Sequence, residues 1–278
     1  MSTRNILICD SGSTKADWLY ADHTGESQVR TKGLNPVRDS FDTIQETLSE
    51  IPSWMPDEVF FYGAGCIPPY SDTLAEALSK RFPQAAIQVE SDMLGAARAL
   101  FGLEEGIACI LGTGSNSCLC RDGNIIKQVP SLGYILGDEG SGAVLGRRLV
   151  GDLLKGQLPQ TLLDAFYEEF GLTQKLIIDK VYRQPAANRF LASLCPFISK
   201  HRNEEGIQNL LSEEFERFLR RNVLQYGLHD LRISYVGGIS VHFENELRAA
   251  HDKLSLEIGT ILSAPAKKMM EFHQKRAF

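Results

Sequence analysis

The sequence predicts an α/β protein made of two related domains, each with a mixed β-sheet flanked by helices. Three observations support this fold class. Strand and helix signals alternate through the first third of the chain, the same pattern restarts near residue 106, and glycine-rich turns follow apolar strands in both halves. A chain of 278 residues is long enough for two such domains.

The first half predicts a sheet that contains both parallel and antiparallel strands. Its expected elements are strands at 5–9 and 16–21, a helix over 40–51, a strand at 59–62, a helix over 71–81 and a strand at 86–90. The first of these helices, for example, has Phe41, Ile44 and Leu48 at helical spacing. Two strands precede the first helix and later strands alternate with helices, so a mixed sheet with helices packed against it is expected.

The second half opens as the first half does. Its first expected elements are a strand at 107–111, a turn at 112–116 and a strand at 117–121. A shift of 102 residues places Gly12 on Gly114 and Ser13 on Ser115. The match favours two related domains, with the chance similarity of two hairpins as the alternative.

The remainder of the chain is mainly helical. The expected elements are helices between 142 and 230, the best of them at 203–226, then a strand at 233–236, a helix with Ser240 as its candidate N-cap, and a last helix over 266–276. We place the N-terminal domain at 1–104 and the C-terminal domain at 105–261.

Composition and charge exclude several classes of protein. The formal charge of −6, from 29 Lys and Arg against 35 Asp and Glu, gives no globally basic surface for nucleic acid. No apolar run reaches the ~18 residues of a membrane span, and the N-terminus lacks a signal-peptide pattern. We therefore expect a cytoplasmic protein. The six cysteines and six histidines form neither a disulfide framework nor a metal-site spacing.

Three glycine-rich turns that follow strands are the main functional signal. They lie at Asp10–Thr14, Gly112–Asn116 and Gly237–Ser240. Small residues let backbone N–H groups converge on phosphate oxygens, and Ser or Thr hydroxyls add donors. Each turn alone is more often a simple tight turn. Three of them, two in matching hairpins, favour a nucleotide bound between two halves.

Carboxylates near these turns supply what phosphoryl transfer needs besides positioning. Asp10 closes the first strand, where it could hold Mg²⁺ or merely cap its turn. Asp92 follows a strand and precedes a helix rich in small residues, so it is a candidate N-cap and a candidate catalytic base. Asp138 and Glu139 lie among glycines, which indicates a polar ligand or a helix N-terminus. Lys15 could bind a phosphate or stay solvated.

These segments together resemble the actin, heat-shock chaperone and sugar kinase superfamily. Asp10–Lys15 and Gly112–Asn116 resemble its two phosphate motifs, and Val236–Ser240 resembles its adenosine motif. Three further segments, Gly33–Pro36, Ser91-Asp92 and Gly137–Ser141, are similar to the N-acetylglucosamine kinase branch. That branch is grouped with ATPases that activate benzoyl-CoA reductase and hydroxyacyl-CoA dehydratase. The resemblance extends from residue 5 to about residue 250.

The resemblance implies a role for individual residues. Asp10 would serve Mg²⁺ and ATP, and Asp92 would act as the general base toward a 6-hydroxyl. The residues implied for ATP are Gly12, Ser13, Thr14, Lys15, Thr113, Gly114, Ser115, Gly237 and Gly238. Those implied for the sugar are Asn35, Gly65, Asp92, Asn116, Gly133, Asp138 and Glu139. ATP would lie in the cleft between the domains, and a helix at 262–278 would pack back on the first domain.

The expected protein is thus an ATP- and Mg²⁺-dependent kinase of an amino sugar, N-acetylglucosamine first among them. Ser131-Leu132-Gly133 stands where such kinases often carry Gly-Trp-Gly, so N-acetylmuramic acid and glucosamine remain alternatives. An ATPase that activates a partner reductase or dehydratase and a non-catalytic sugar sensor are two further alternatives. Members of the family are often dimers, so a homodimer is considered, and no nucleic-acid or membrane partner is expected.

Overall fold

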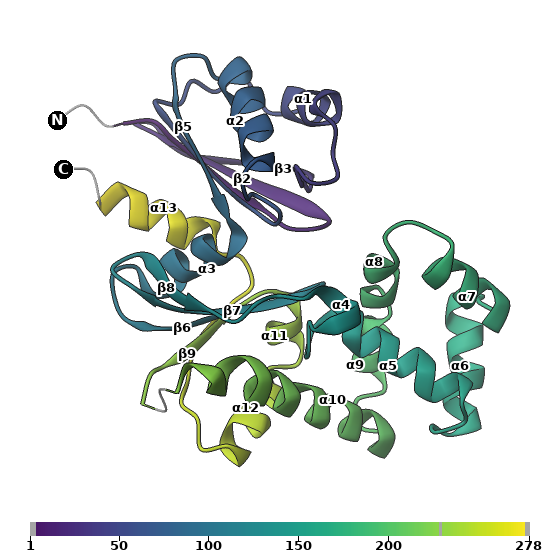
Figure 1. Ribbon diagram of the computed structural model, residues 1–278. Helices are drawn as coiled ribbons and strands as arrows, with labels where there is room; N and C mark the ends of the chain where they lie inside the picture. The colour runs from purple at the N-terminus through teal and green to yellow at the C-terminus, as the bar shows by residue number, and fades with distance from the viewer. Residues whose placement is uncertain (1–3, 228–229, 276–278) are drawn as a thin grey trace. The chain divides into compact units, whose positions relative to one another are not determined.

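A computed structural model describes residues 4–227 and 230–275 (Figure 1). The chain divides into two compact units. The first unit comprises Met1–Ala108, Cys120–Ile126 and Ala264–Phe278, and the second unit comprises Cys109–Leu119 and Lys127–Ser263. In the described ranges, no helix is long and apolar enough to cross a membrane.

The first sheet has five strands in the order β3-β2-β1-β4-β5. Its strands are β1 (Ile6–Ser11), β2 (Lys15–Asp22), β3 (Gly25–Lys32), β4 (Glu58–Gly63) and β5 (Ala86–Ser91). The pairs β1–β2 and β2–β3 are antiparallel, whereas β1–β4 and β4–β5 are parallel. The sheet is therefore mixed, as the sequence predicts, and the carboxyl ends of β1, β4 and β5 share one edge.

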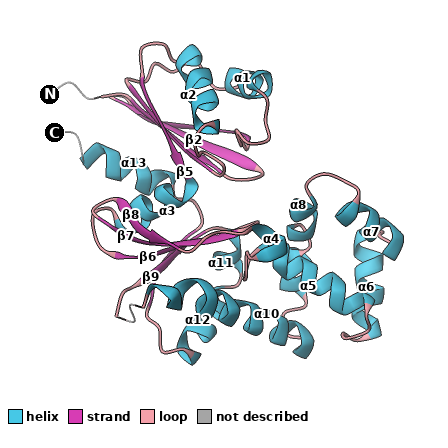
Figure 2. Ribbon diagram, viewed as in Figure 1, coloured by secondary structure: helices cyan, strands magenta, loops and turns pink. Residues whose placement is uncertain are grey.

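Helices cover both faces of this sheet (Figure 2). They are α1 (Phe41–Ser49), α2 (Tyr70–Arg81), α3 (Asp92–Phe101) and α13 (Ala266–Lys275). Because strand side chains alternate between faces, Leu7 and Cys9 pack in a core with α1 and α2. Ile6 and Ile8 pack on the opposite face with residues of α3 and α13. Asp10 follows the same alternation, so its side chain faces the side that α3 covers.

Close packing fixes α3 against the sheet and α13. A Cβ on Gly95 of α3 would lie 2.6 Å from the Met269 side chain and 2.8 Å from that of Tyr62. Arg98, one turn further along α3, donates to the Tyr62 hydroxyl at 2.8 Å and to the Gly123 carbonyl at 3.1 Å. The first residue of α3, Asp92, therefore has a fixed place relative to β1 and β4.

The second sheet repeats the topology of the first. Its order is β10-β9-β6-β7-β8, with β6 (Gly106–Leu111), β7 (Ser115–Arg121), β8 (Asn124–Gln128), β9 (Ile233–Val236) and β10 (Ile258–Leu262). Read from the hairpin edge, the orders 3-2-1-4-5 and 8-7-6-9-10 correspond strand by strand. The strands β1 and β6 also share one burial pattern, in which only the fifth residue is half-buried. The predicted fold class is confirmed.

The register of the repeat differs from the prediction. Strand β6 begins 100 residues after β1 (residue 106 against residue 6), and β7 begins 100 residues after β2 (residue 115 against residue 15). Gly12 therefore corresponds to Gly112, and the predicted shift of 102 residues is wrong. Both shifts match Gly12 to a glycine, and only the shift of 100 residues also aligns the buried positions of β1 and β6.

The remaining helices lie between strands of the second sheet in the chain order, α4 to α10 before β9 and α11 and α12 before β10. They are α4 (Gly133–Leu136), α5 (Gly142–Leu154), α6 (Gln160–Phe170), α7 (Gln174–Tyr182), α8 (Ala187–Ala192), α9 (Cys195–Lys200), α10 (Glu205–Phe218), α11 (Gly238–His242) and α12 (Glu244–Lys253). The helix expected over 203–226 begins as α10, then continues as a π-helical turn at Leu219–Val223 and a 3₁₀ turn at Leu224–Tyr226.

Two further expectations need correction. Strands β3, β8 and β10 are absent from the predicted order, because none shows a buried apolar run: six of the eight residues of β3 are exposed. Ser240 is not an N-cap. It lies inside α11, where its hydroxyl donates to the Gly237 carbonyl at 2.8 Å, and Gly237 is the N-cap residue.

Candidate functional site

The turn between β1 and β2 presents free backbone donors on a rigid base. The Gly12 N–H donates to the Lys15 carbonyl at 2.9 Å, and the Gly33 N–H donates to the Thr14 carbonyl at 3.1 Å. A Cβ on Gly33 would lie 2.2 Å from the Gly12 carbonyl oxygen, so this close approach requires glycine. Across the described residues, no hydrogen bond occupies the N–H groups of Ser13 and Thr14. The turn can bind an anion such as phosphate.

Three aspartates gather beside this turn. Asp10 and Asp17 face each other across the β1–β2 pair, and Asp17 forms ion pairs with Arg30 at 2.6 Å and with Lys15 at 3.4 Å. The pKa of Asp10 is raised to about 7, mainly because burial disfavours the charged form and further because the Asp92 and Asp17 carboxylates lie nearby; Lys15 opposes the rise. The Asp92 and Asp17 carboxylates therefore make the electrostatic potential at Asp10 more negative.

Asp92 is the first residue of α3, and the N-cap of that helix is Ser91. The Ser91 side chain accepts from the Leu94 N–H at 3.2 Å, so the candidate N-cap role of Asp92 is wrong. One Asp92 oxygen instead accepts from the Met93 N–H at 2.8 Å. Burial raises the pKa of Asp92, and this N–H contact partly offsets the rise. A carboxylate with a raised pKa is a stronger proton acceptor than an ordinary one.

Asn35 and Gly65 lie in contact in the first unit. The Asn35 Oδ1 accepts from the Val37 N–H at 3.0 Å, and the Asn35 N–H donates to Asp39 at 2.7 Å. Gly65 has a φ of +80°, and a Cβ there would lie 2.5 Å from Asn35 Oδ1. Gly65 thus leaves room for the Asn35 amide, whose orientation the Asx turn fixes.

The turn between β6 and β7 is anchored differently from its counterpart. The N–H groups of Gly142 and Ala143, at the start of α5, donate to the Gly112 and Thr113 carbonyls at 2.8 and 3.0 Å. Gly237, with a φ of +120°, would place a Cβ 2.3 Å from the Leu111 carbonyl. The structure therefore brings the second phosphate motif and the glycines of the adenosine motif to one end of the second sheet.

Asp138 lies against this second turn. A Cβ on Gly114 would be 3.0 Å from Asp138 Oδ2, and the Ser131 hydroxyl lies 3.4 Å from Asp138 Oδ1. Burial raises the pKa of Asp138. Hydrogen bonds from the Ser115 N–H and the Ser131 hydroxyl partly offset this rise. The backbone of Asp138 is left-handed, with a φ of +53°. Such a strained, partly shielded carboxylate is suited to hold a ligand hydroxyl.

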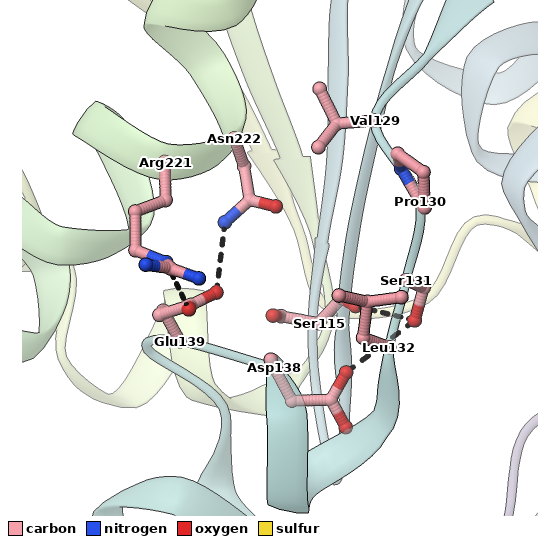
Figure 3. Close-up of a pocket in the computed structure, with 10 residues that line it drawn as sticks. Ser115, Val129, Pro130, Ser131, Leu132, Asp138, Glu139, Arg221 and Asn222 are labelled. Carbon is pink, nitrogen blue, oxygen red and sulfur yellow. Dashed lines mark hydrogen bonds and ion pairs between the residues drawn. The ribbon is translucent and has the colours of Figure 1, made fainter.

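Glu139, the neighbouring acid, already has protein partners. Its side chain is buried and forms an ion pair with Arg221 at 2.5 Å, and it accepts from Asn222 Nδ2 at 3.2 Å. Arg221 and Asn222 come from the π-helical turn that follows α10. Figure 3 shows these three side chains on one side of a pocket of about 150 Å³, with Asp138, Ser131 and Leu132 on the other.

The remaining predicted residues differ in their surroundings. Asn116 Oδ1 accepts from Gln128 at 3.0 Å and from the Ser117 N–H at 2.9 Å. Gly133 begins the short helix α4 with a φ of +72° and has open space at its Cβ position. Sequence reasoning missed Asp17, Arg221 and Asn222. The first is marked only by its register with Asp10, and the other two carry no local signal.

The chain is similar to solved structures of sugar kinases. No protein-family model and no curated protein matches its sequence. A candidate N-acetylglucosamine kinase from Porphyromonas gingivalis is 44% identical, with a TM-score of 0.95 over 98% of this chain and 100% of that one. A second candidate N-acetylglucosamine kinase, from Chromobacterium violaceum, has 19% identity and a TM-score of 0.75 over 98% and 99% of the two chains.

A more distant similarity concerns the fold alone. A candidate N-acetylmannosamine kinase from Listeria monocytogenes is 15% identical, with a TM-score of 0.50 over 98% of this chain and 99% of that one. The Chromobacterium violaceum protein, at 19% identity, likewise supports the fold and nothing finer.

Proposed function

This chain belongs to the N-acetylglucosamine kinase branch of the actin-like ATPase and sugar kinase superfamily, and we propose that this ATP-dependent sugar kinase phosphorylates the 6-hydroxyl of an amino sugar, N-acetylglucosamine first among them. The observation that carries the proposal is the placement of Asp92. Asp92 is the first residue of α3 and its pKa is raised. Its carboxylate lies close enough to Asp10 to raise the pKa of that residue as well.

Asp92 is proposed as the general base. In the reaction, the sugar 6-hydroxyl attacks the γ-phosphorus of ATP, the bond from that phosphorus to the bridging oxygen of ADP breaks, and the hydroxyl proton passes to an Asp92 oxygen. Phosphoryl transfer depends mostly on positioning and on neutralising charge, with the base orienting the attacking hydroxyl. The fixed place of α3 against β4 and α13 supports this role, because a base must be held within hydrogen-bond reach of its proton.

Asp10 is the proposed acidic residue for Mg²⁺. Burial, and then the nearby Asp92 and Asp17 carboxylates, make ionisation of Asp10 costly without a counter-ion. Hard oxygen donors are the ligands that Mg²⁺ takes, directly or through water. The residues present therefore fit a bound magnesium ion. Mg²⁺ would neutralise charge on the ATP phosphates when it is bound.

The two glycine-rich turns are proposed to bind the ATP phosphates. In the first unit these residues are Gly12, Ser13, Thr14 and Lys15, and in the second unit they are Thr113, Gly114 and Ser115. Gly237 and Gly238 are proposed to lie along the adenosine. Support comes from the equivalent places of the two turns in two sheets of the same topology and from unoccupied N–H donors in the first turn.

The sugar is proposed to be held by Asn35 and Gly65 of the first unit and by Asn116, Gly133, Asp138 and Glu139 of the second. Asp138 is the strongest of these, because its half-buried carboxylate lines the pocket and lies against the second turn. Glu139 acts through Arg221 and Asn222, its present partners.

The alternative of an ATPase that activates a reductase has less support. Such a role uses a cluster shared between subunits through surface cysteines, whereas all six cysteines here are buried. Burial and the nearby carboxylates Asp92 and Glu90 raise the pKa of Cys66 to about 12, which keeps this thiol protonated and unreactive.

The test is ADP release from Mg²⁺–ATP with glucose, glucosamine, N-acetylglucosamine, N-acetylmannosamine and N-acetylmuramic acid. The expected result is strong stimulation by N-acetylglucosamine, with coupled ³¹P–¹H spectra locating the phosphate on C6. Asp92→Asn serves as the inactive control. Hydrolysis that no sugar stimulates would favour the reductase-activating ATPase, and the absence of any turnover together with sugar binding would favour a sensor.

A further inference from the structure

The pocket beside Asp138 is built to accept a small neutral group. Its volume of about 150 Å³ is large enough for a substituent of a few heavy atoms. One wall is apolar, from Val129, Pro130 and Leu132, and the opposite wall carries the Asn222 amide (Figure 3).

The orientation of the Asn222 amide follows from its neighbour. Glu139 Oε2 is a carboxylate oxygen and can only accept while ionised, so the Asn222 atom that lies 3.2 Å from it must be the NH₂ group. The Arg221 guanidinium, 2.5 Å from the other Glu139 oxygen, forms an ion pair that holds the carboxylate in place. Asn222 Oδ1 consequently points away from Glu139 toward the pocket, as Figure 3 shows, where it can accept a hydrogen bond.

Both walls are fixed before any ligand arrives. The Tyr226 hydroxyl accepts from the Val129 N–H at 3.2 Å and bonds to Ser117 at 2.7 Å. Lys127 donates to the Gln225 carbonyl at 2.9 Å, which ties the strand end to the segment after the π-helical turn. A π-helical turn inserted in a long helix is frequent at functional sites. Here it places two consecutive side chains, Arg221 and Asn222, on Glu139.

We propose that this pocket binds the 2-acetamido group of the sugar, with Asn222 Oδ1 accepting the amide N–H. The methyl group packs against Val129, Pro130 and Leu132. This inference rests on the proposed function and deepens it, since it names the residue that selects an N-acetylated sugar. Asp138, on the rim of the same pocket, is the proposed ligand of a ring hydroxyl.

The charges of the pocket decide between the possible substituents. Two carboxylates, Asp138 and Glu139, face one guanidinium, Arg221. A 3-O-lactyl carboxylate would meet a net negative charge and is disfavoured there. The net negative charge would attract a 2-ammonium group, but that group would place a charge against the apolar wall of Val129, Pro130 and Leu132. An acetamido group matches both the Asn222 acceptor and the apolar wall.

The experiment combines one protein change with one substrate change. The substrates are N-acetylglucosamine, glucose and the isosteric ketone in which CH₂ replaces the amide N–H. Wild type should use the ketone with a kcat/KM ~10-fold below that of N-acetylglucosamine, because a site built around a hydrogen bond rejects the analogue lacking it. Asn222→Ala should lower kcat/KM ~10- to 100-fold for N-acetylglucosamine and about 2-fold or less for glucose and the ketone.

Arg220→Ala is the matched control, because Arg220 lies on the same π-helical turn and forms an exposed ion pair with Glu216 at 3.9 Å. It should leave all three substrates unchanged. Equal losses of Asn222→Ala on all three substrates would overturn the inference, and so would a wild type that prefers the ketone or glucosamine. A preference for N-acetylmuramic acid over N-acetylglucosamine that Asn222→Ala abolishes, with activity on N-acetylglucosamine unchanged, would also overturn it, since the pocket would then hold the lactyl group.

Failure of the kinase proposal can be told apart from failure of this inference. If wild type phosphorylates no sugar, calorimetric titration of N-acetylglucosamine into wild type and Asn222→Ala decides. Binding that is lost only in the variant supports the pocket while refuting the kinase, and no binding to wild type refutes both. The ketone comparison on wild type does not depend on whether Asn222→Ala folds.

Discussion

Replacing Asp10 with asparagine should abolish phosphoryl transfer and, in the absence of nucleotide, make the protein more stable above neutral pH. Asp10 ends up half-buried beside Asp92 and Asp17, and its pKa is about 7 against an ordinary 3.8. The shift of about 3 units corresponds to at most ~4 kcal/mol at about 1.36 kcal/mol per unit. Partial exposure of the side chain reduces this, so we expect ~2 to 4 kcal/mol.

The direction of the pH dependence follows from where each state binds the proton. The pKa of Asp10 is higher in the folded protein than in the unfolded chain, so between about pH 4 and pH 7 the unfolded chain binds fewer protons. The contribution of Asp10 to the free energy of unfolding therefore falls as pH rises through this range and stays at its lowest above it. Asparagine at position 10 cannot ionise, so the Asp10→Asn variant keeps the free energy of unfolding that wild type loses between about pH 4 and pH 7.

Urea unfolding of the nucleotide-free protein between pH 4.5 and 8.5, with a chelator present, measures the effect. The curves for wild type and Asp10→Asn should lie close together at the acid end and separate by ~2 to 4 kcal/mol at the alkaline end. Asp164→Asn is the matched control, since Asp164 is exposed on α6 and asparagine can still accept from Gln160. An Asp10→Asn variant with the same pH slope as wild type, or with lower stability at pH 8.5, would refute the reasoning.

Three further changes test other parts of the site. Asp92→Asn should cut turnover at least ~100-fold and leave ATP affinity unchanged, measured by single-turnover kinetics and nucleotide titration; near-normal turnover would remove Asp92 as the base. Gly65→Ala forces a Cβ to 2.5 Å from Asn35 Oδ1, so KM for the sugar should rise ~10-fold while KM for ATP does not, and an unchanged sugar KM would contradict this. Glu214→Ala removes a buried carboxylate that pairs with the partly exposed Arg148 and the exposed Arg217, while Arg148 keeps Glu213 as a partner, so urea unfolding should show a loss of ~1 to 3 kcal/mol, and no measurable loss would show that these ion pairs do not stabilise the fold.

The parts of the site that the sequence could indicate are those encoded next to a strand end. Asp10 lies one residue before the end of the buried strand β1, and Asp92 directly follows β5. An acidic residue at such a point lies at the carboxyl edge of the parallel strands, where ligands bind in open α/β sheets. The glycines of the three turns are visible for the same reason, because a backbone that must approach another closely excludes other residues, as at Gly33 and Gly237.

The parts that could not be predicted depend on tertiary contacts. Asn222 and Glu139 are 83 residues apart in sequence. The sequence around Asn222 has the pattern of an amphipathic helix, and nothing in that pattern indicates that Asn222 lines a pocket. Similarly, Ser91 and Asp92 are both good N-cap residues. Strand β5 ends at Ser91, which makes Ser91 the N-cap of α3 and Asp92 its first helical residue. Strand β3 is exposed on most of its length, so hydrogen bonding to β2 holds it without any apolar pattern.

The two sheets keep one topology while fixing their turns by different means, and this difference separates what the fold must preserve from what it can vary. In the first unit, Gly33 packs against the backbone of the turn. Its neighbour Leu34 donates its N–H to the Ser11 hydroxyl at 2.9 Å and accepts from that hydroxyl at 2.9 Å. In the second unit, the first N–H groups of α5 hold the turn. Because the strand positions and the turn are retained when the supports differ, the constraint common to both halves is the presentation of backbone donors by the turn. Backbone donors of this kind suit the phosphate groups that both turns are proposed to bind. The residues proposed for the sugar, Asn35 with Gly65 in the first unit and Asp138 with the pocket of Asn222 in the second, have no counterpart across the repeat. This is expected if each of them contacts a different chemical group of an unsymmetrical substrate.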